Sequence, residues 1–228
     1  MFLKTGELKK IMKAALKTGG LTVGNIDHHY LVCTLLWGVY VANDHASNKF
    51  KAAITELIGD LPDPGECFEC RYDSDNKVQE QFCFNYPSPY SEWREARDFA
   101  TKTPVALEVW PYEYRLYQKK STLGFLAFDS ILTDIIISPG ELEPDESMPG
   151  RPSVSKDNIL YFKNDFMIYW VRSEKMPEKV REVVLPHLKG LDFFQYNWTE
   201  IPEEDTEDAE DMEEHDIAEE QLTYERRT

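Results

Sequence analysis

The sequence predicts an α+β fold, with mostly antiparallel strands and helices packed on one face of the sheet. Apolar residues repeat with the period of a helix in a few segments and with the two-residue period of a strand in many others. The strand-like segments are short and are joined by turn residues, as in antiparallel hairpins. Hydrophobic residues make up 42% of the 228 residues, which is enough for a substantial core.

Four helices are predicted. Ser47 is suited to cap the second helix because its hydroxyl can accept a free backbone N–H. Glycines follow the first two helices, where a left-handed backbone is common. Pro186 is expected to kink the last helix. The residues expected to face inward on that helix are Val180, Val183, Val184 and Leu188. The predicted helices cover Leu8–Leu16, Asn48–Ile58, Ser88–Ala100 and Pro177–Leu188.

The predicted strands are short, with one exception. Between residues 105 and 118, Trp110, Tyr112 and Tyr114 alternate with other residues, which predicts one strand with a buried aromatic face and an irregularity at Pro111. Stacking of RNA bases on this face would need interleaved basic residues, so a place in the core is favoured. The segment 130–137 fits a helix or a strand, and 139–152 fits a long loop. The predicted strands cover Leu21–Ile26, Tyr30–Leu35, Trp37–Val41, Glu66–Tyr72, Lys77–Phe84, Val105–Gln118, Leu123–Phe128, Ile159–Phe162 and Phe166–Arg172.

The chain is expected to form one body of residues 1–200 followed by a tail. The body holds a weak internal repeat, because Tyr30–Pro62 and Ile159–Pro186 both predict two strands, a loop, an apolar-faced helix and a Leu-Pro pair. A duplication would divide the body into similar halves, 1–85 and 104–200. Chance similarity between two common α+β units is the alternative.

The end of the chain is strongly acidic. Residues 203–220 hold 12 acidic residues in 18 and no lysine or arginine, and residues 201–228 (13 acids, two arginines) supply −11 of the formal net charge of −17. Like charges cannot bury themselves together, so 201–228 is predicted to be a solvated, disordered interaction tail. Such a tail favours basic partners and repels nucleic acid. Partner contacts are expected at Glu203, Glu204, Asp205, Glu207, Asp208, Glu210, Asp211, Glu213 and Glu214.

The first helix is basic in an otherwise acidic protein. Residues 1–17 hold five lysines and one glutamate. A solvated helix face explains this pattern, because exposed lysines suit helices. The alternatives are a contact with nucleic acid or a partner, or a docking surface for the acidic tail. The residues of this face are Lys9, Lys10, Lys13 and Lys17.

The cysteines resemble part of a zinc site but lack a fourth ligand. Their three-residue spacing would place Cys67 and Cys70 on opposite faces of a strand. The hairpin register would place Cys67 opposite Cys83 instead. Structural cysteines are therefore favoured, with Cys67, Cys70 and Cys83 as weak metal candidates, because tetrahedral zinc needs four converging ligands. Cys33 is predicted to lie in the core, and no cofactor is expected.

No catalytic site is predicted. The sequence holds no nucleophile elbow, phosphate loop or dinucleotide fingerprint. Asp27, His28 and His29 fit a solvated turn, since adjacent turn residues seldom converge on one ion, and a catalytic role needs a partner within hydrogen-bond reach. His45 and His187 have no evident partner either.

These observations predict a non-enzymatic, acidic interaction or inhibitor protein, of the kind that phages or mobile elements encode. It would bind a basic, nucleic-acid-binding partner protein and present carboxylates where phosphates would lie. One alternative is a structural scaffold of the duplicated α+β type that sliding clamps use, and another is a small zinc-binding or enzymatic domain. No membrane-length apolar segment occurs, so a cytoplasmic protein is expected, and direct nucleic-acid binding is not.

Overall fold

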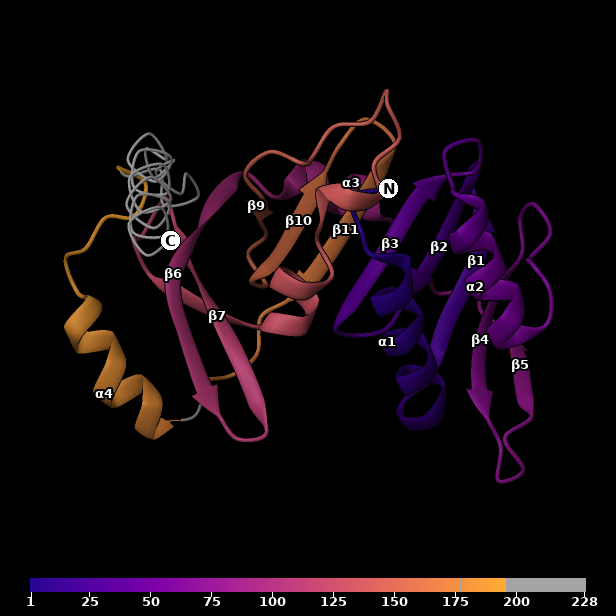
Figure 1. The fold of residues 1–228 in the computed structure, drawn as a ribbon, viewed down its shortest axis with the longest axis horizontal. Helices are drawn as coiled ribbons and strands as arrows, with labels where there is room; N and C mark the ends of the chain where they lie inside the picture. Colours follow the sequence, from indigo (N-terminus) through magenta and orange to yellow (C-terminus); the bar gives the residue numbers. More distant parts are fainter. Residues whose placement is uncertain (177, 196–228) are drawn as a thin grey trace, which may run out of the picture. The chain divides into compact units, whose positions relative to one another are not determined.

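The computed structural model describes residues 1–176 and 178–195, which form one compact unit. Its core element is an antiparallel sheet in the order β5-β4-β1-β2-β3-β11-β10-β9-β6-β7-β8 (Figure 1). The predicted α+β class with antiparallel strands is confirmed. The acidic tail lies outside the described residues. Among the residues described, no helix combines the length and the apolar character needed to cross a membrane.

The described residues form four α-helices, two short helical turns and eleven strands. The helices are α1 (Thr5–Thr18), α2 (Asn48–Ile58), α3 (Pro89–Glu95) and α4 (Glu178–Leu188), with a π-helical turn η1 (Ile131–Ile135) and a 3-10 turn η2 (Pro139–Glu141). The strands are β1 (Leu21–Ile26), β2 (His29–Cys33), β3 (Trp37–Ala42), β4 (Cys67–Tyr72), β5 (Val78–Phe82), β6 (Asp98–Val109), β7 (Tyr112–Lys119), β8 (Phe125–Asp129), β9 (Ser153–Val154), β10 (Ile159–Lys163) and β11 (Met167–Arg172).

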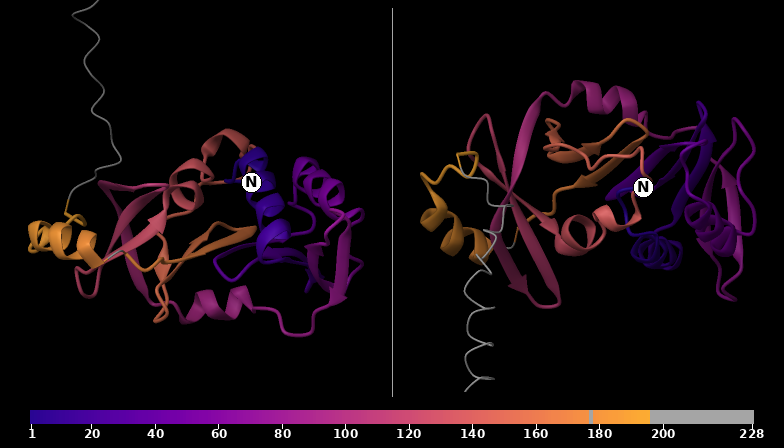
Figure 2. Two further views of the ribbon diagram at one scale, coloured as in Figure 1. Left: turned by 90° about the horizontal axis from the view of Figure 1, so that it is seen from below. Right: turned by 45° about the horizontal axis from the view of Figure 1, so that its top comes forward.

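The two predicted amphipathic helices cover one face of the sheet. Leu8 and Met12 of α1, and Phe50 and Ile54 of α2, are buried in the same cluster as the inward face of the central strands. The Ser47 hydroxyl caps α2 as predicted, accepting the N–H of residue 50 at 3.2 Å. The opposite face of the central strands packs against the α3 segment, which lies on the other side of the sheet from α1 (Figure 2).

Strands β3 and β11 join the two ends of the sheet. They pair from Trp37 with Val171 to Val41 with Met167. Gly38 pairs with Trp170, and the indole lies across the glycine so closely that a Cβ there would meet its ring carbons at 2.1 and 2.4 Å. Only a residue without a side chain therefore fits beneath this tryptophan.

The two hairpins that meet at this pair correspond residue by residue. Strands β2 and β3 span residues 29–33 and 37–42, and β10 and β11 span 159–163 and 167–172, so every boundary differs by 130. Helices α2 and α4, at 48–58 and 178–188, keep this difference. Residues 39 and 169 pair with each other at the centre of a pseudo-two-fold arrangement.

Backbone hydrogen bonds follow the same symmetry. The Arg172 N–H donates to the Leu36 carbonyl at 2.7 Å, and the corresponding Ala42 N–H donates to the Phe166 carbonyl at 3.0 Å. The arrangement differs where the chain leaves the hairpins. Strand β4 lies beside β1, whereas the place beside β9 is taken by β6. Residue 104, the predicted start of the second half, falls inside β6.

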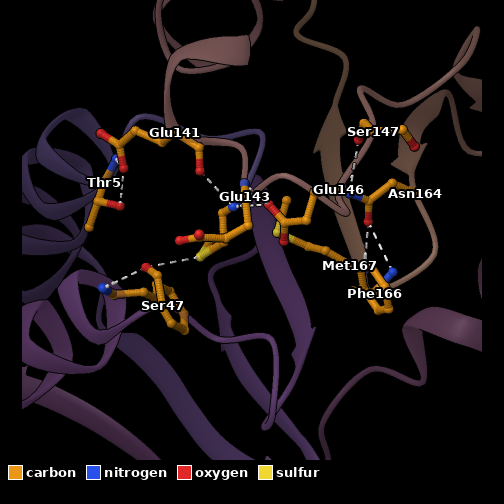
Figure 3. Close-up of polar contacts among 11 residues, drawn as sticks. Thr5, Ser47, Glu141, Glu143, Glu146, Ser147, Asn164, Phe166 and Met167 are labelled. Carbon is orange, nitrogen blue, oxygen red and sulfur yellow. Dashed lines mark hydrogen bonds and ion pairs between the residues drawn. The ribbon is translucent and has the colours of Figure 1, made fainter.

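The N-terminal residues are held by the segment after η2. The α-amino group of Met1 donates to the Glu141 carbonyl at 2.9 Å and forms a buried ion pair with Glu146 (Figure 3). The Thr5 hydroxyl donates to the Glu141 carboxylate at 2.6 Å. The buried pair fixes residues 141–146 against the start of α1.

Several predicted elements are wrong. The single strand predicted for 105–118 is a hairpin of β6 and β7, because Trp110 and Pro111 form its turn, and Trp110 is 93% exposed rather than buried. Tyr112 is also exposed, while Tyr114 is buried. The predicted helix 88–100 ends at Glu95 because the chain enters β6 at residue 98.

Burial on the last helix differs from the prediction. Of the residues predicted to face inward on α4, Val183 is exposed, while Leu188 packs against the cluster formed by Tyr114 and Leu116. The side chain of Val180 lies outside the described parts. The ambiguous segment 130–137 forms the π-helical turn η1.

Replacing Gly38 with alanine is expected to destabilise the protein. The added methyl group would collide with Trp170 and would lie 2.6 Å from the Cys33 Cβ, and overpacking of this kind costs about 1–3 kcal/mol. Urea denaturation of the variant measures the loss. Gly6→Ala in α1 is the control, because nothing lies within 4 Å of a Cβ at Gly6, and alanine favours helices. Equal stability of Gly38→Ala and wild type would contradict the packing of Trp170 on β3.

Candidate protein-binding groove

An apolar groove of about 400 Å³ lies between α1, the β2–β3 loop and η1. Its lining comes from four separate segments of the chain, so no single motif encodes it. Several lining aliphatic side chains are open to water, with exposed fractions of 91% for Leu35, 47% for Leu36 and 44% for Ile131. The lining residues are Ile11, Ala14, Ala15, Thr18, Gly19, Gly20, Thr34, Leu35, Leu36, Trp37, Asp129, Ile131, Leu132 and Glu174.

The β2–β3 loop is held firmly despite its exposed leucines. The Thr34 hydroxyl accepts the N–H groups of Leu36 at 3.1 Å and Trp37 at 3.3 Å. Arg172 binds the other side of the loop, its N–H donating to the Leu36 carbonyl and its Nε to the Leu35 carbonyl at 3.2 Å. The hydrogen bonds therefore present Leu35 to solvent on a fixed backbone.

Two carboxyl groups border the apolar floor. The Asp129 carboxylate accepts the N–H of Ile131 at 2.8 Å, and the Glu174 N–H donates to the Ala127 carbonyl at 2.9 Å. Burial raises the pKa of Asp129. Burial, and then the charge of Asp129, raise the pKa of Glu174, while a hydrogen bond with Tyr114 acts in the opposite direction. A cation placed at this rim would stabilise the charged form of each carboxyl group.

Two lysines of α1 lie near the groove. Ala14 lies on the groove, and Lys10 and Lys17 lie four and three residues from it, so they are its neighbours on the helix surface. Lys10 forms an ion pair with Glu7 at 2.8 Å. Neither lysine is a lining residue, whereas Asp129 and Glu174 are, so the charged groups that line the groove are acidic.

The pseudo-two-fold relation explains why this groove stays open. Its symmetric counterpart is built around the β10–β11 loop, where the Asn164 side chain accepts the N–H groups of Phe166 at 3.1 Å and Met167 at 2.9 Å, as Thr34 does in the first hairpin (Figure 3). In this counterpart, side chains occupy the space that corresponds to the groove. His45 stacks on Phe166 with ring centroids 3.5 Å apart, and the Met1 ion pair closes the site.

The predicted lysine face is partly neutralised. Lys9 forms an ion pair with Glu56 of α2, and Lys10 pairs with Glu7. Lys13 and Lys17 are exposed and form no ion pair within the described part of the chain. The predicted tail contacts from Glu203 to Glu214 all lie outside the described residues.

The cysteines are arranged as the strand geometry predicts. Cys67 and Cys70 lie in clusters on opposite faces of the sheet. Cys67 faces Cys83 across the hairpin, and the Cys83 N–H donates to the Cys67 carbonyl at 2.8 Å. Burial raises the pKa of the Cys33, Cys67 and Cys70 thiols to about 12. In residues 1–176 and 178–195, no group of three cysteine, histidine or acidic side chains could hold a metal ion.

The histidines take part in local packing. Asp27 and His28 form the β1–β2 turn, both with positive φ. His29 stacks on Tyr40, with centroids 4.2 Å apart. Sequence reasoning missed the groove because Leu35 was placed in a strand, and because Asp129, Ile131 and Glu174 have no pattern that connects them to it. The adjacent leucines at 35 and 36, directly before a strand, were the one available signal.

Comparisons with known proteins give no family. No protein-family model matches the sequence, and no curated protein matches it. Among solved structures, the chain is similar to the β subunit of DNA polymerase III from Thermotoga maritima, with a TM-score of 0.30 and 10% identity. The similarity covers 80% of this chain and 66% of that subunit, just under two thirds of its length. A TM-score of this size carries no argument about function.

Proposed function

We propose that the protein is a non-enzymatic interaction protein that binds a basic partner protein. The groove holds an apolar segment of the partner, and the acidic tail supplies long-range attraction. The groove between α1, the β2–β3 loop and η1 carries the proposal, because fixed, exposed aliphatic side chains lie beside two partly buried carboxyl groups.

The chemistry of the groove defines one kind of occupant. Leu35, Leu36 and Ile131 supply an apolar surface whose burial would be favourable. Asp129 and Glu174 select a lysine or arginine next to the apolar side chain, since like charges at this rim would repel. A segment with adjacent aliphatic and basic residues satisfies both. Nucleic-acid-binding surfaces are rich in lysine and arginine, so a partner of that class would supply the basic residue.

Peptide binding tests the groove directly. The full-length protein is titrated with an eight-residue peptide that holds two leucines and two lysines, and with matched peptides in which glutamate replaces lysine or serine replaces leucine. The first peptide is expected to bind at least about fivefold more tightly than either control. Backbone amide shifts of residues 34–37 and 129–132 should follow the binding curve.

A matched pair of variants locates the site. Ile131→Ser should weaken binding of the leucine–lysine peptide about fivefold, because it removes exposed apolar surface from the groove. Ile135→Ser is the control, since Ile135 belongs to the same turn and is similarly exposed, at 43%, but does not line the groove. Equal effects of the two substitutions would rule out the groove as the binding site.

The same titration has a defined pH dependence. Asp129 and Glu174 have pKa values raised above their ordinary 3.8 and 4.5. As the pH falls, both carboxylates should therefore become protonated at a higher pH than ordinary carboxylates do. The preference for lysine over glutamate peptides should be lost while the pH is still above the ordinary pKa values of 3.8 and 4.5. Glu174→Gln should reduce this preference at neutral pH. A preference that persists unchanged to the ordinary pKa values would contradict the role of the two carboxyl groups.

The tail is expected to add a salt-dependent part to partner binding. Once a basic partner is identified, removal of residues 203–228 should lower its affinity and flatten the dependence on salt, because exposed charges are screened within about 8 Å at physiological ionic strength. Calorimetry at 50 and 300 mM salt would measure both effects. An affinity that does not change on truncation would remove Glu203–Glu214 from the mechanism.

The duplicated scaffold is the second candidate, and the constant difference of 130 between the two hairpins favours it. Among the described residues, β5 is the outermost strand at one end of the sheet, and its last residue, Phe82, is exposed, so this edge is available to another copy. A scaffold assembled through this edge should form defined oligomers in light scattering, and Phe82→Lys should dissociate them. A monomer at high concentration would exclude this assembly.

A further inference from the structure

A second pocket lies on the opposite face of the sheet from the groove. It has a volume of about 440 Å³ and is bounded by the β1–β2 turn, β3 and residues 86–91. Tyr40 lines this pocket, whereas Trp37 lines the groove, and their odd spacing in β3 places them on different faces. The pocket and the groove are therefore separate sites.

Aromatic rings form much of its wall. Tyr40, Tyr86 and Tyr90 all line the pocket. Tyr40 is buried and stacks on His29 at an interplanar angle of 5°, so its ring is fixed. Tyr86 and Tyr90 are partly open to water. Ring faces carry negative electrostatic potential, which attracts cations placed over them.

One acidic residue, Asp27, lines the pocket. Asp27 is the only acidic residue among those that line the pocket in the described part of the chain, and no lysine or arginine lines it there. Asp27 occupies the tight β1–β2 turn with φ of 52°, followed by His28 with φ of 62°. The His29 ring contacts the Asp27 carbonyl at 2.7 Å, which helps to fix the turn. The charge of Asp27 also contributes to a raised pKa of Tyr40, after burial.

We propose that this pocket binds an organic cation, either a free quaternary ammonium compound or the guanidinium or ammonium group of a protein side chain. The rings of Tyr40 and Tyr86 contact the apolar body of the cation, and the Asp27 carboxylate balances its charge. Within the protein, the Tyr90 ring already forms a cation–π contact with the Arg94 guanidinium, which lies 5.9 Å from the ring centroid. This site does not depend on the groove.

Titration of the full-length protein with defined probes tests the site. Choline and N-acetyl-arginine amide represent the two sources of the cation, and 3,3-dimethylbutan-1-ol has the shape of choline without its charge. At least one of the two cations should shift the ring signals of Tyr40 and Tyr86 in a saturable way. Its affinity should be at least about threefold higher than that of the neutral alcohol. The tighter of the two cations identifies the source. Equal binding of the alcohol, or saturation by neither cation, would overturn the proposal.

Variants separate charge from shape. Asp27→Asn should weaken cation binding at least about threefold while keeping the turn, because asparagine tolerates the left-handed backbone. Asp75→Asn, at an exposed position in the β4–β5 turn, should leave it unchanged. Tyr86→Phe should retain binding and Tyr86→Leu should lose it. An unchanged affinity for the cation in Asp27→Asn would contradict the proposal. Ile131→Ser should leave cation binding unchanged, because Ile131 lines the groove and not this pocket.

Discussion

The pairing of β3 with β11 is the contact on which the rest of the structure depends. It joins segments about 130 residues apart, and its alternating side chains build two cores. Val39 and Tyr169 face the core under α1 and α2, while Tyr40 and Trp170 face the core on the other side. Gly38 permits this pairing because Trp170 fills the place of its side chain. Separation of the two strands would expose both cores at once.

The same pairing also fixes the surface sites. Arg172 at the end of β11 holds the β2–β3 loop, so the exposed leucines of the groove depend on β11 for their position. Tyr169 reaches across the core and donates its hydroxyl to the Leu132 carbonyl at 2.8 Å, which ties η1 to the same strand. Two of the groove's walls are thus anchored to one strand.

The pseudo-two-fold arrangement shows where the halves diverge. A shared hairpin design, with Thr34 in one loop and Asn164 in the other, produces an open groove on one side and a filled site on the other. The difference arises from their surroundings: α1 is a regular helix, whereas residues 141–146 fold onto Met1 through a buried ion pair. We propose a duplication as the origin of the two hairpins.

The sequence predicts the elements with strong local patterns. The bounds of β1 and α2 are as predicted, because an apolar stripe and a cap determine them locally. The β6–β7 hairpin was missed because Trp110 and Pro111 continue the alternation of a strand although they form a turn. The groove and the tyrosine pocket could not be predicted, since their residues meet only through the tertiary fold. The tail charge is evident from sequence, but its contacts are not.

Hydrogen–deuterium exchange of the amides that cross from one hairpin to the other tests the central role of β3 and β11 most directly. The Arg172 and Ala42 amides, which donate to the Leu36 and Phe166 carbonyls, should exchange as slowly as the amides within β3 and only through global unfolding. Fast exchange at Arg172 and Ala42, with slow exchange retained inside each separate hairpin, would show that the halves open independently and would contradict this account.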